Sequence, residues 1–175
     1  MSNTAYWENR LQLNKSVSIP TVLKTFEDTG RVRALTKELK EGEKQHIFWE
    51  SDLAKWMEAV FLHLQKEPDP DLLEFADSVI EKLINNQESD GYLNSYFSFY
   101  EPDNKFTNLK VRHELYCAGH LLESALEHLK LNPNSKFFAA MEKYIDHIAE
   151  VFGTDEGQKR GYPGHQEIEL ALLKT

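Results

Sequence analysis

Apolar side chains recur at intervals of three and four along most of this chain, which is the spacing of one face of an α-helix. In residues 48–66 this pattern selects Leu53, Trp56, Met57, Val60, Phe61 and Leu64. Residues 70–84 and residues 135–152 carry the same pattern. We find no convincing strand pattern anywhere in the sequence. The sequence therefore predicts an all-α chain of about six helices joined by loops.

Helix ends are predicted by capping residues and prolines. Asp69 is expected to cap the helix over residues 70–84, with Pro70 in its first turn, because an aspartate oxygen accepts from free N–H groups and proline lacks one. Ser51 or Asp52 is expected to cap the preceding helix in the same way. These signals favour well-defined boundaries in the middle of the chain.

The two ends of the chain are less regular. Residues 1–16 form a mixed, polar arm, and a short helix is predicted over residues 20–29. Residues 31–45 are dense in charge, which is typical of a solvated helix or loop. A last helix is expected to start near His165. We therefore treat residues 17–175 as the helical part of a single domain.

The longest regular segment, residues 111–131, has two patterned faces. One is apolar and rich in small residues: Leu115, Ala118, Gly119, Leu122, Ala125, Leu126 and Leu129. The other carries His113, Cys117, His120 and Ser124. Because nearly every side of this helix carries residues suited to packing or to polar contacts, we expect it to lie inside a helical assembly.

Three residues of the second face, His113, Cys117 and His120, are of types that bind zinc. The two histidines lie about 10 Å apart along a helix axis, too far for one ion without strain. We therefore expect no metal site in this chain, with Cys117 acting as a small buried hydrophobe and His120 as a core histidine. A nucleophilic pair of Cys117 with His113 or His120 is an alternative that would need a low thiol pKa.

Composition narrows the class of protein. With 29 acidic against 20 basic residues, the formal net charge is −9, which argues against a nucleic-acid partner. No apolar run is long enough to span a membrane, and the N-terminus lacks the pattern of a secretory signal. One cysteine cannot form an internal disulfide. We therefore expect a cytoplasmic protein with no membrane partner.

Several blocks of this sequence resemble glycoside hydrolase family 127, the β-L-arabinofuranosidase family. The most specific are His-Glu-Leu-Tyr-Cys-Ala-Gly-His-Leu at 113–121 and Tyr-Pro-Gly-His-Gln-Glu-Ile-Glu-Leu-Ala-Leu at 162–172. Residues 17–23, 49–60 and 87–97 fit the same family in the same order. The resemblance covers most of the chain.

The resemblance implies an (α/α)6 helical toroid and hydrolysis of terminal β-L-arabinofuranosyl groups. Polar and aromatic openings of alternate helices favour the same toroid, with inner helices pointing their N-termini at one mouth. The family's chains are several times longer. We therefore expect residues 1–175 to be the N-terminal portion, about half, of the barrel. A natural short protein with a frayed last helix is the alternative.

In the family, a zinc-bound cysteine thiolate is the nucleophile and a glutamate is the acid/base, and both lie downstream of this region. The resemblance therefore implies no catalytic residue and no cofactor in this chain, which alone is expected to be inactive. An exposed apolar edge would favour self-association or binding of the missing C-terminal part. The alternative function is a non-catalytic helical module that binds carbohydrate or a partner.

Four residues are predicted to contact substrate. His113 and His165 match family histidines that contact the sugar, although histidines at helix starts can instead bond nearby backbone. Asp90 and Tyr92 open an aromatic segment, residues 92–110, whose rings would either stack on sugar or close over the core as a lid. Carboxylates that could act as a pair are Glu50, Asp52, Asp90, Glu114, Glu167 and Glu169, among which Glu114 and Glu167 are expected to support the neighbouring histidines.

Overall fold

The computed structural model describes residues 3–175, and in this range every regular element is helical apart from one isolated bridge between Phe152 and Lys159. The all-α prediction is confirmed. The helices are α1 (Asn3–Leu13), α2 (Ile19–Asp28), α3 (Arg31–Ala34), α4 (Trp49–Leu64), α5 (Pro70–Ile84), α6 (Ser95–Tyr100), α7 (Glu114–Leu131), α8 (Lys136–Val151) and α9 (Glu167–Leu172). A π-helical turn (Asn14–Ser18) joins α1 to α2, and a 3-10 turn (Pro102–Asn104) follows α6.

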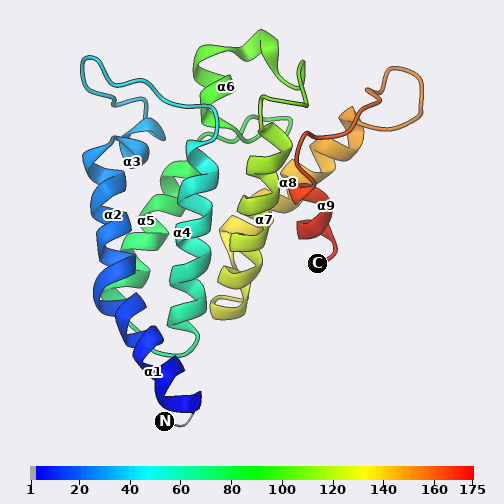
Figure 1. Ribbon diagram of the computed structural model, residues 1–175. Coiled ribbons are helices and arrows are strands. Elements are labelled where there is room, and N and C mark those ends of the chain that lie inside the picture. The colour runs from blue at the N-terminus through cyan, green and yellow to red at the C-terminus, as the bar shows by residue number, and fades with distance from the viewer. Residues whose placement is uncertain (1–2) are drawn as a thin grey trace.

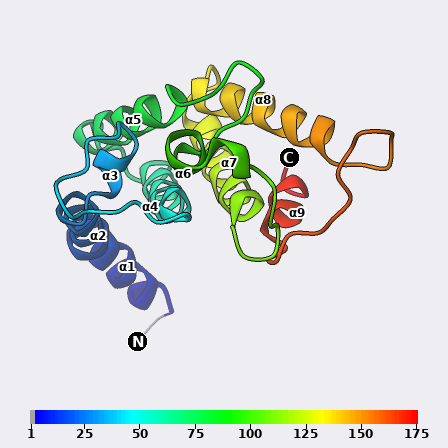
Figure 2. The same cartoon turned by 90° about the horizontal axis from the view of Figure 1, so that it is seen from above.

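The helices form two rows that curve into an open arc (Figures 1 and 2). Helices α4, α7 and α9 lie side by side along the inner row, and α5 and α8 lie along the outer row. Helices α1 and α2 lie at one end of the arc and α9 at the other. No helix among the described residues combines the length and apolarity that a membrane crossing requires.

The core lies where α4 and α7 meet, backed by α5 and α8. Its fully buried side chains include Met57, Val60, Phe61, Leu83, Leu121, Leu122, Phe137 and Met141. The small residues of α7 allow close packing, as predicted. A side chain added at Gly119 would lie 2.7 Å from the carbonyl carbon of Glu167, so the start of α9 rests directly on α7.

The structure confirms one predicted helix cap and contradicts another. Asp69 caps α5 as predicted, because its carboxylate accepts from the backbone N–H of Leu72 at 3.1 Å. The predicted cap by Ser51 or Asp52 is wrong, since both residues lie inside the first turn of α4 and no side chain caps that helix. The Ser51 hydroxyl instead donates to the carbonyl of Phe48.

The buried rings of residues 92–110 pack on the core, which agrees with the interpretation that this segment closes over the core as a lid. Two carboxylates at helix starts hold this segment by its backbone. Glu50 accepts from the N–H of Ser95 at 2.6 Å, and Glu114 accepts from the N–H of Phe106 at 2.8 Å. The short helix α6 within the segment was not predicted, because its run of aromatic residues has no helical period.

Candidate functional site

A hollow of about 190 Å³ opens where the N-terminal ends of α4 and α7 meet the loop before α9. Its lining comes from three sequence-distant segments and consists of Phe48, Ser51, Asp52, Lys55, His113, Tyr116 and His165. The structure thus brings together two of the four residues predicted to contact substrate, His113 and His165.

The two histidines lie face to face. Their ring centroids are 5.0 Å apart and the ring planes differ by only 10°. Phe48 and Tyr116 meet the ring of His113 edge-on, with centroids at 5.7 and 5.6 Å. An aromatic frame therefore fixes the orientation of His113.

Backbone geometry places each histidine. His113 precedes the first turn of α7 with a left-handed backbone (φ 59°), which turns the chain sharply into the helix. Gly164 lies against the chain before that turn, since its N–H donates to the carbonyl of Leu109 at 3.0 Å. An added side chain at Gly164 would lie 2.0 Å from the carbonyl oxygen of Lys110. A glycine is therefore required for His165 to approach His113.

The electrostatics of the hollow favour neutral imidazole at His113. Partial burial and the nearby His165 lower the pKa of His113, so it is uncharged at neutral pH. A neutral imidazole can donate one hydrogen bond and accept another. The pair can therefore bind a ligand that carries several hydroxyl groups.

Charged groups complete the lining: Asp52, a candidate carboxylate from the sequence, and Lys55, which the sequence analysis did not single out. The ammonium of Lys55 lies 5.0 Å from the centre of the Tyr116 ring and 3.5 Å from the Ser51 hydroxyl. The carboxylate of Asp52 accepts from Arg31 at 2.9 Å. The spacing of Ser51, Asp52 and Lys55 on one helix was a signal that could have identified them.

Asp90 and Tyr92 do not line this hollow, so the structure does not bring them together with the two histidines. Tyr92 has no exposed surface, and its hydroxyl donates to Glu114 at 2.6 Å. Asp90 is exposed, and its carboxylate accepts from the N–H of Tyr92 and lies 3.6 Å from His147. Both residues stabilise the start of the aromatic segment.

Cys117 is buried, and burial strongly raises the pKa of its thiol. A nucleophilic thiol needs a lowered pKa and access to substrate, so the Cys117 nucleophile alternative fails. This cysteine also lacks a second cysteine with which to bind zinc. The residues of this chain therefore do not fit the cysteine-bound zinc site that the family resemblance implies, and the resemblance itself places that site downstream.

The candidate carboxylates are dispersed rather than paired at the hollow. Glu50 and Glu114 are buried and hold backbone N–H groups, as described above. Glu167 lies against His120 of α7, with Oε1 3.0 Å from Nδ1, which is a different histidine from its sequence neighbour His165. Among the lining residues Asp52 is the one carboxylate, so the hollow does not hold the carboxylate pair that most glycosidases use.

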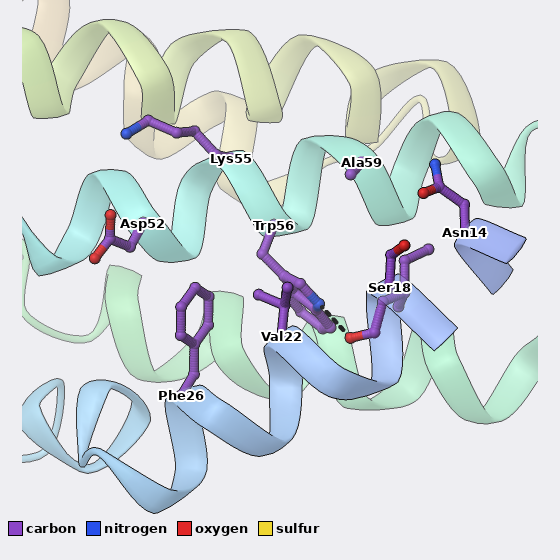
Figure 3. A pocket seen from close by; sticks show the side chains of 9 residues that line it. Asn14, Ser18, Val22, Phe26, Asp52, Lys55, Trp56 and Ala59 are labelled. Carbon is purple, nitrogen blue, oxygen red and sulfur yellow. Dashed lines mark hydrogen bonds between the residues drawn. The ribbon is translucent and has the colours of Figure 1, made fainter. Parts of the chain in front are cut away.

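A second, larger hollow of about 410 Å³ lies between α2 and α4 (Figure 3). Apolar side chains, among them Val22, Phe26 and Trp56, dominate its wall. The indole N–H of Trp56 already donates to the carbonyl of Ile19 at 3.1 Å. The histidine-lined hollow, with its converging polar groups, is therefore the better candidate for a specific ligand site.

Together the fold and the hollow define an all-α protein whose inner helices converge on a polar and aromatic mouth. The chain belongs to glycoside hydrolase family 127, since the family described as "Beta-L-arabinofuranosidase, GH127 catalytic domain" matches residues 2–175. It is also similar to the non-reducing end β-L-arabinofuranosidase of Bifidobacterium longum subsp. longum, with 33% identity over 132 residues. That match covers 73% of this chain and 20% of the relative.

Solved structures agree with this assignment. A GH127 β-L-arabinofuranosidase from Geobacillus stearothermophilus T6 superposes with a TM-score of 0.91 at 40% identity, and a second GH127 β-arabinofuranosidase with a TM-score of 0.87 at 30% identity. Each match covers 97% of this chain and 28% of the solved chain. The chain therefore spans between a fifth and a third of the length of these relatives.

Proposed function

We propose that this chain supplies part of the sugar-binding site of a β-L-arabinofuranosidase. The observation that carries the proposal is the stacked pair of His113 and His165, which come from the two most family-specific blocks and meet in one hollow. The family relatives are named as arabinofuranosidases, which supports a furanose sugar as the ligand.

The chemistry of the hollow suits a sugar. Neutral imidazole at His113 and the ammonium of Lys55 can donate hydrogen bonds to ring hydroxyls, and the carboxylate of Asp52 can accept them. The ring of Tyr116 offers an apolar surface beside them. These groups would bind and orient a sugar without breaking its glycosidic bond.

The proposal places the catalytic nucleophile, the acid/base and any zinc outside this chain. It is supported by the single carboxylate at the hollow and by the buried state of Cys117. In the same proposal, the open arc of helices is one part of an (α/α)6 toroid, and the remainder of the protein covers its apolar edges. The chain alone would then bind arabinofuranosides weakly and not hydrolyse them.

Ligand-detected NMR with p-nitrophenyl β-L-arabinofuranoside tests the proposal. We expect weak binding by the chain, and binding about fivefold weaker in His113→Ala, since each lost hydrogen bond contributes about 1 kcal/mol. His165→Ala should behave similarly. No p-nitrophenol should be released, with or without added zinc.

The control variant is Asp90→Asn, which alters an exposed residue that sequence analysis grouped with the histidines. It should bind like the unsubstituted chain. Equal loss of binding in Asp90→Asn and His113→Ala would place the ligand elsewhere. Turnover by the chain alone that disappears in His113→Ala would show that the catalytic groups lie within it.

A further inference from the structure

A second cluster of chemically active side chains lies between α7 and α9, outside the histidine-lined hollow. His120 and Glu123 project from α7, and Glu167 projects from the first residue of α9. One ligand atom from each of the three lies within 4.8 Å of the other two. Among the described residues, this is the one group of three or more histidine, cysteine or acidic side chains so arranged.

The distances in the cluster match the edges of a zinc coordination shell. The Nδ1 atom of His120 lies 3.0 Å from Oε1 of Glu167 and 3.4 Å from Oε2 of Glu123. Ligands about 2.0–2.1 Å from a tetrahedral zinc ion are separated by roughly 3.3 Å. Two of the three ligand separations are thus close to those around one shared ion, and the third, between the two carboxylates, is within 4.8 Å.

Two of these atoms are buried and make no hydrogen bond: Nδ1 of His120 and Oε1 of Glu167. They lie at contact distance, yet their geometry is not that of a donor pointing at an acceptor. Buried polar atoms without partners are costly, and each such case in a folded protein calls for an unseen partner. A cation bound between these two adjacent atoms would satisfy both of them.

The protonation states also suit a cation. Burial, with the charge of Lys55 beside it, lowers the pKa of His120 to about 4, so its imidazole is neutral and can act as a ligand. Burial and the facing carboxylate of Glu123 raise the pKa of Glu167 to about 7. Two carboxylates this close need either a shared proton or a cation between them.

Besides Lys55, which lies near His120, one cation bonds directly to the cluster. The ammonium of Lys174 bonds Oε1 of Glu123, which leaves Oε2, the oxygen facing His120, free of it. Lys174 itself is half exposed at the edge of the cluster, and Glu58 offsets part of its charge. The lysine therefore weakens the attraction for a metal ion without filling its position.

We propose that His120, Glu123 and Glu167 form a binding site for a zinc-type divalent cation, with water as the remaining ligand, that ties the start of α9 to α7. One imidazole and two carboxylates are a zinc-compatible donor set. Glu167 follows His165 by two residues, so an ion held here would also fix His165 against His113. This site is independent of any catalytic zinc and of the sugar.

Equilibrium dialysis of the metal-free chain against zinc chloride, followed by metal analysis, tests the proposal. We expect one tightly held zinc ion per chain and a weakening of at least about tenfold in Glu167→Gln. His113→Ala and Cys117→Ser should retain the ion, since neither residue belongs to the cluster. With zinc at about 100 times its dissociation constant, the melting temperature should rise by roughly 5–10 °C.

Two further measurements do not depend on a variant that could unfold. Cobalt(II) bound to the unsubstituted chain should show the visible bands of a low-coordinate nitrogen and oxygen site, without the thiolate charge-transfer band that Cys117 would add. Lys174→Met removes an exposed competing ammonium and should tighten zinc binding about three- to tenfold. A merely structural role of the cluster would not produce this gain.

Three outcomes would overturn the proposal. The first is the absence of stoichiometric zinc binding, which would leave the cluster as a network that shares a proton. The second is equal binding in Glu167→Gln and the unsubstituted chain. The third is loss of binding in His113→Ala or Cys117→Ser, which would assign the ion to other residues.

Discussion

Glu50 is a carboxyl group buried at the first turn of α4 with half of its hydrogen-bonding capacity unmet. Its Oε1 accepts from the N–H of Ser95 at 2.6 Å, whereas Oε2 has no hydrogen-bond partner. Burial raises the pKa of Glu50 to about 7. The side chain therefore holds the aromatic segment by one oxygen and keeps a proton on the other below neutral pH.

A raised carboxyl pKa makes stability fall as pH rises, because the folded state holds a proton that the unfolded state releases near pH 4.5. We expect Glu50 to destabilise the fold progressively between about pH 4.5 and pH 7. In Glu50→Gln this pH dependence should be absent, because a glutamine side chain does not titrate. The free energy of unfolding of the unsubstituted chain minus that of Glu50→Gln should therefore drop by roughly 2–3 kcal/mol over this range.

Urea unfolding at several pH values measures this difference. Histidines whose pKa is lowered in the folded chain, such as His113, make stability rise with pH instead. Their contribution is the same in both chains, so it cancels when the two free energies of unfolding are subtracted. An exposed control is Glu38→Gln, for which the difference should stay flat. A difference for Glu50→Gln that grows with pH would show that Glu50 is ionised when buried.

At the scale of single elements, the four long helices of the core could be predicted, and so could α2 and α9, whereas α6 could not. Helices α4, α5, α7 and α8 each show several repeats of an apolar period, which local sequence can specify. Helix α6 has only six residues, too few for a period, and the N-cap bond in which the Asn94 side chain accepts from the N–H of Phe97 is a detail of a single turn. Its position depends on tertiary contacts to Glu50.

The site was predictable only in part for a related reason. His113 and His165 could be identified by motif. Their stacking depends on the close approach of two backbone segments at Gly164, which the hydrophobic pattern of the sequence does not predict. Likewise, Glu167 meets His120 across 47 positions of chain, a pairing that only the packing of α9 on α7 creates. Long-range contacts of this kind are fixed by the fold and not by spacing.

Gly119 controls how closely α9 packs on α7, and Gly119→Ala tests this packing. The added methyl group would lie 2.7 Å from a backbone carbon of Glu167, so the start of α9 must shift. Alanine would otherwise favour the helix by up to about 1 kcal/mol. We nevertheless expect a net loss of roughly 1–3 kcal/mol in the free energy of unfolding, together with weaker sugar binding as His165 moves from His113.

Chemical denaturation and the NMR binding experiment check the two effects. Lys130→Ala, at the exposed end of the same helix, is the control and should change neither by more than about 0.5 kcal/mol. A Gly119→Ala chain that gains stability would mean that α9 has room to move away at no cost. Unchanged sugar binding would separate the position of His165 from the contact at Gly119.

At the scale of the whole molecule, the helices at the two ends of the arc (Figure 2) expose apolar side chains. Helices α1 and α2 with the turn between them expose Tyr6, Trp7, Leu11, Leu13, Val17 and Val22, and α9 and the residue after it expose Leu170, Leu172 and Leu173. Contiguous apolar surface is rare on monomers and usually marks a contact site. Both rows of helices thus end in surfaces that favour association.

We therefore expect the 175-residue chain, studied alone, to self-associate through these ends. Sedimentation velocity should show the apparent mass rising with concentration, and Trp7→Asp or Leu173→Asp should each reduce the effect because a charge in an apolar contact must be desolvated. Both side chains are well exposed, at 60% and 86%, so neither change should unfold the chain. Tyr162→Ser is the control, since Tyr162 is 89% exposed but belongs to the loop before α9 and to neither of the two sets of exposed side chains. A chain that stays monomeric at every concentration would contradict the prediction, and so would equal effects of Tyr162→Ser and Leu173→Asp, because the association would then not depend on the ends of the arc.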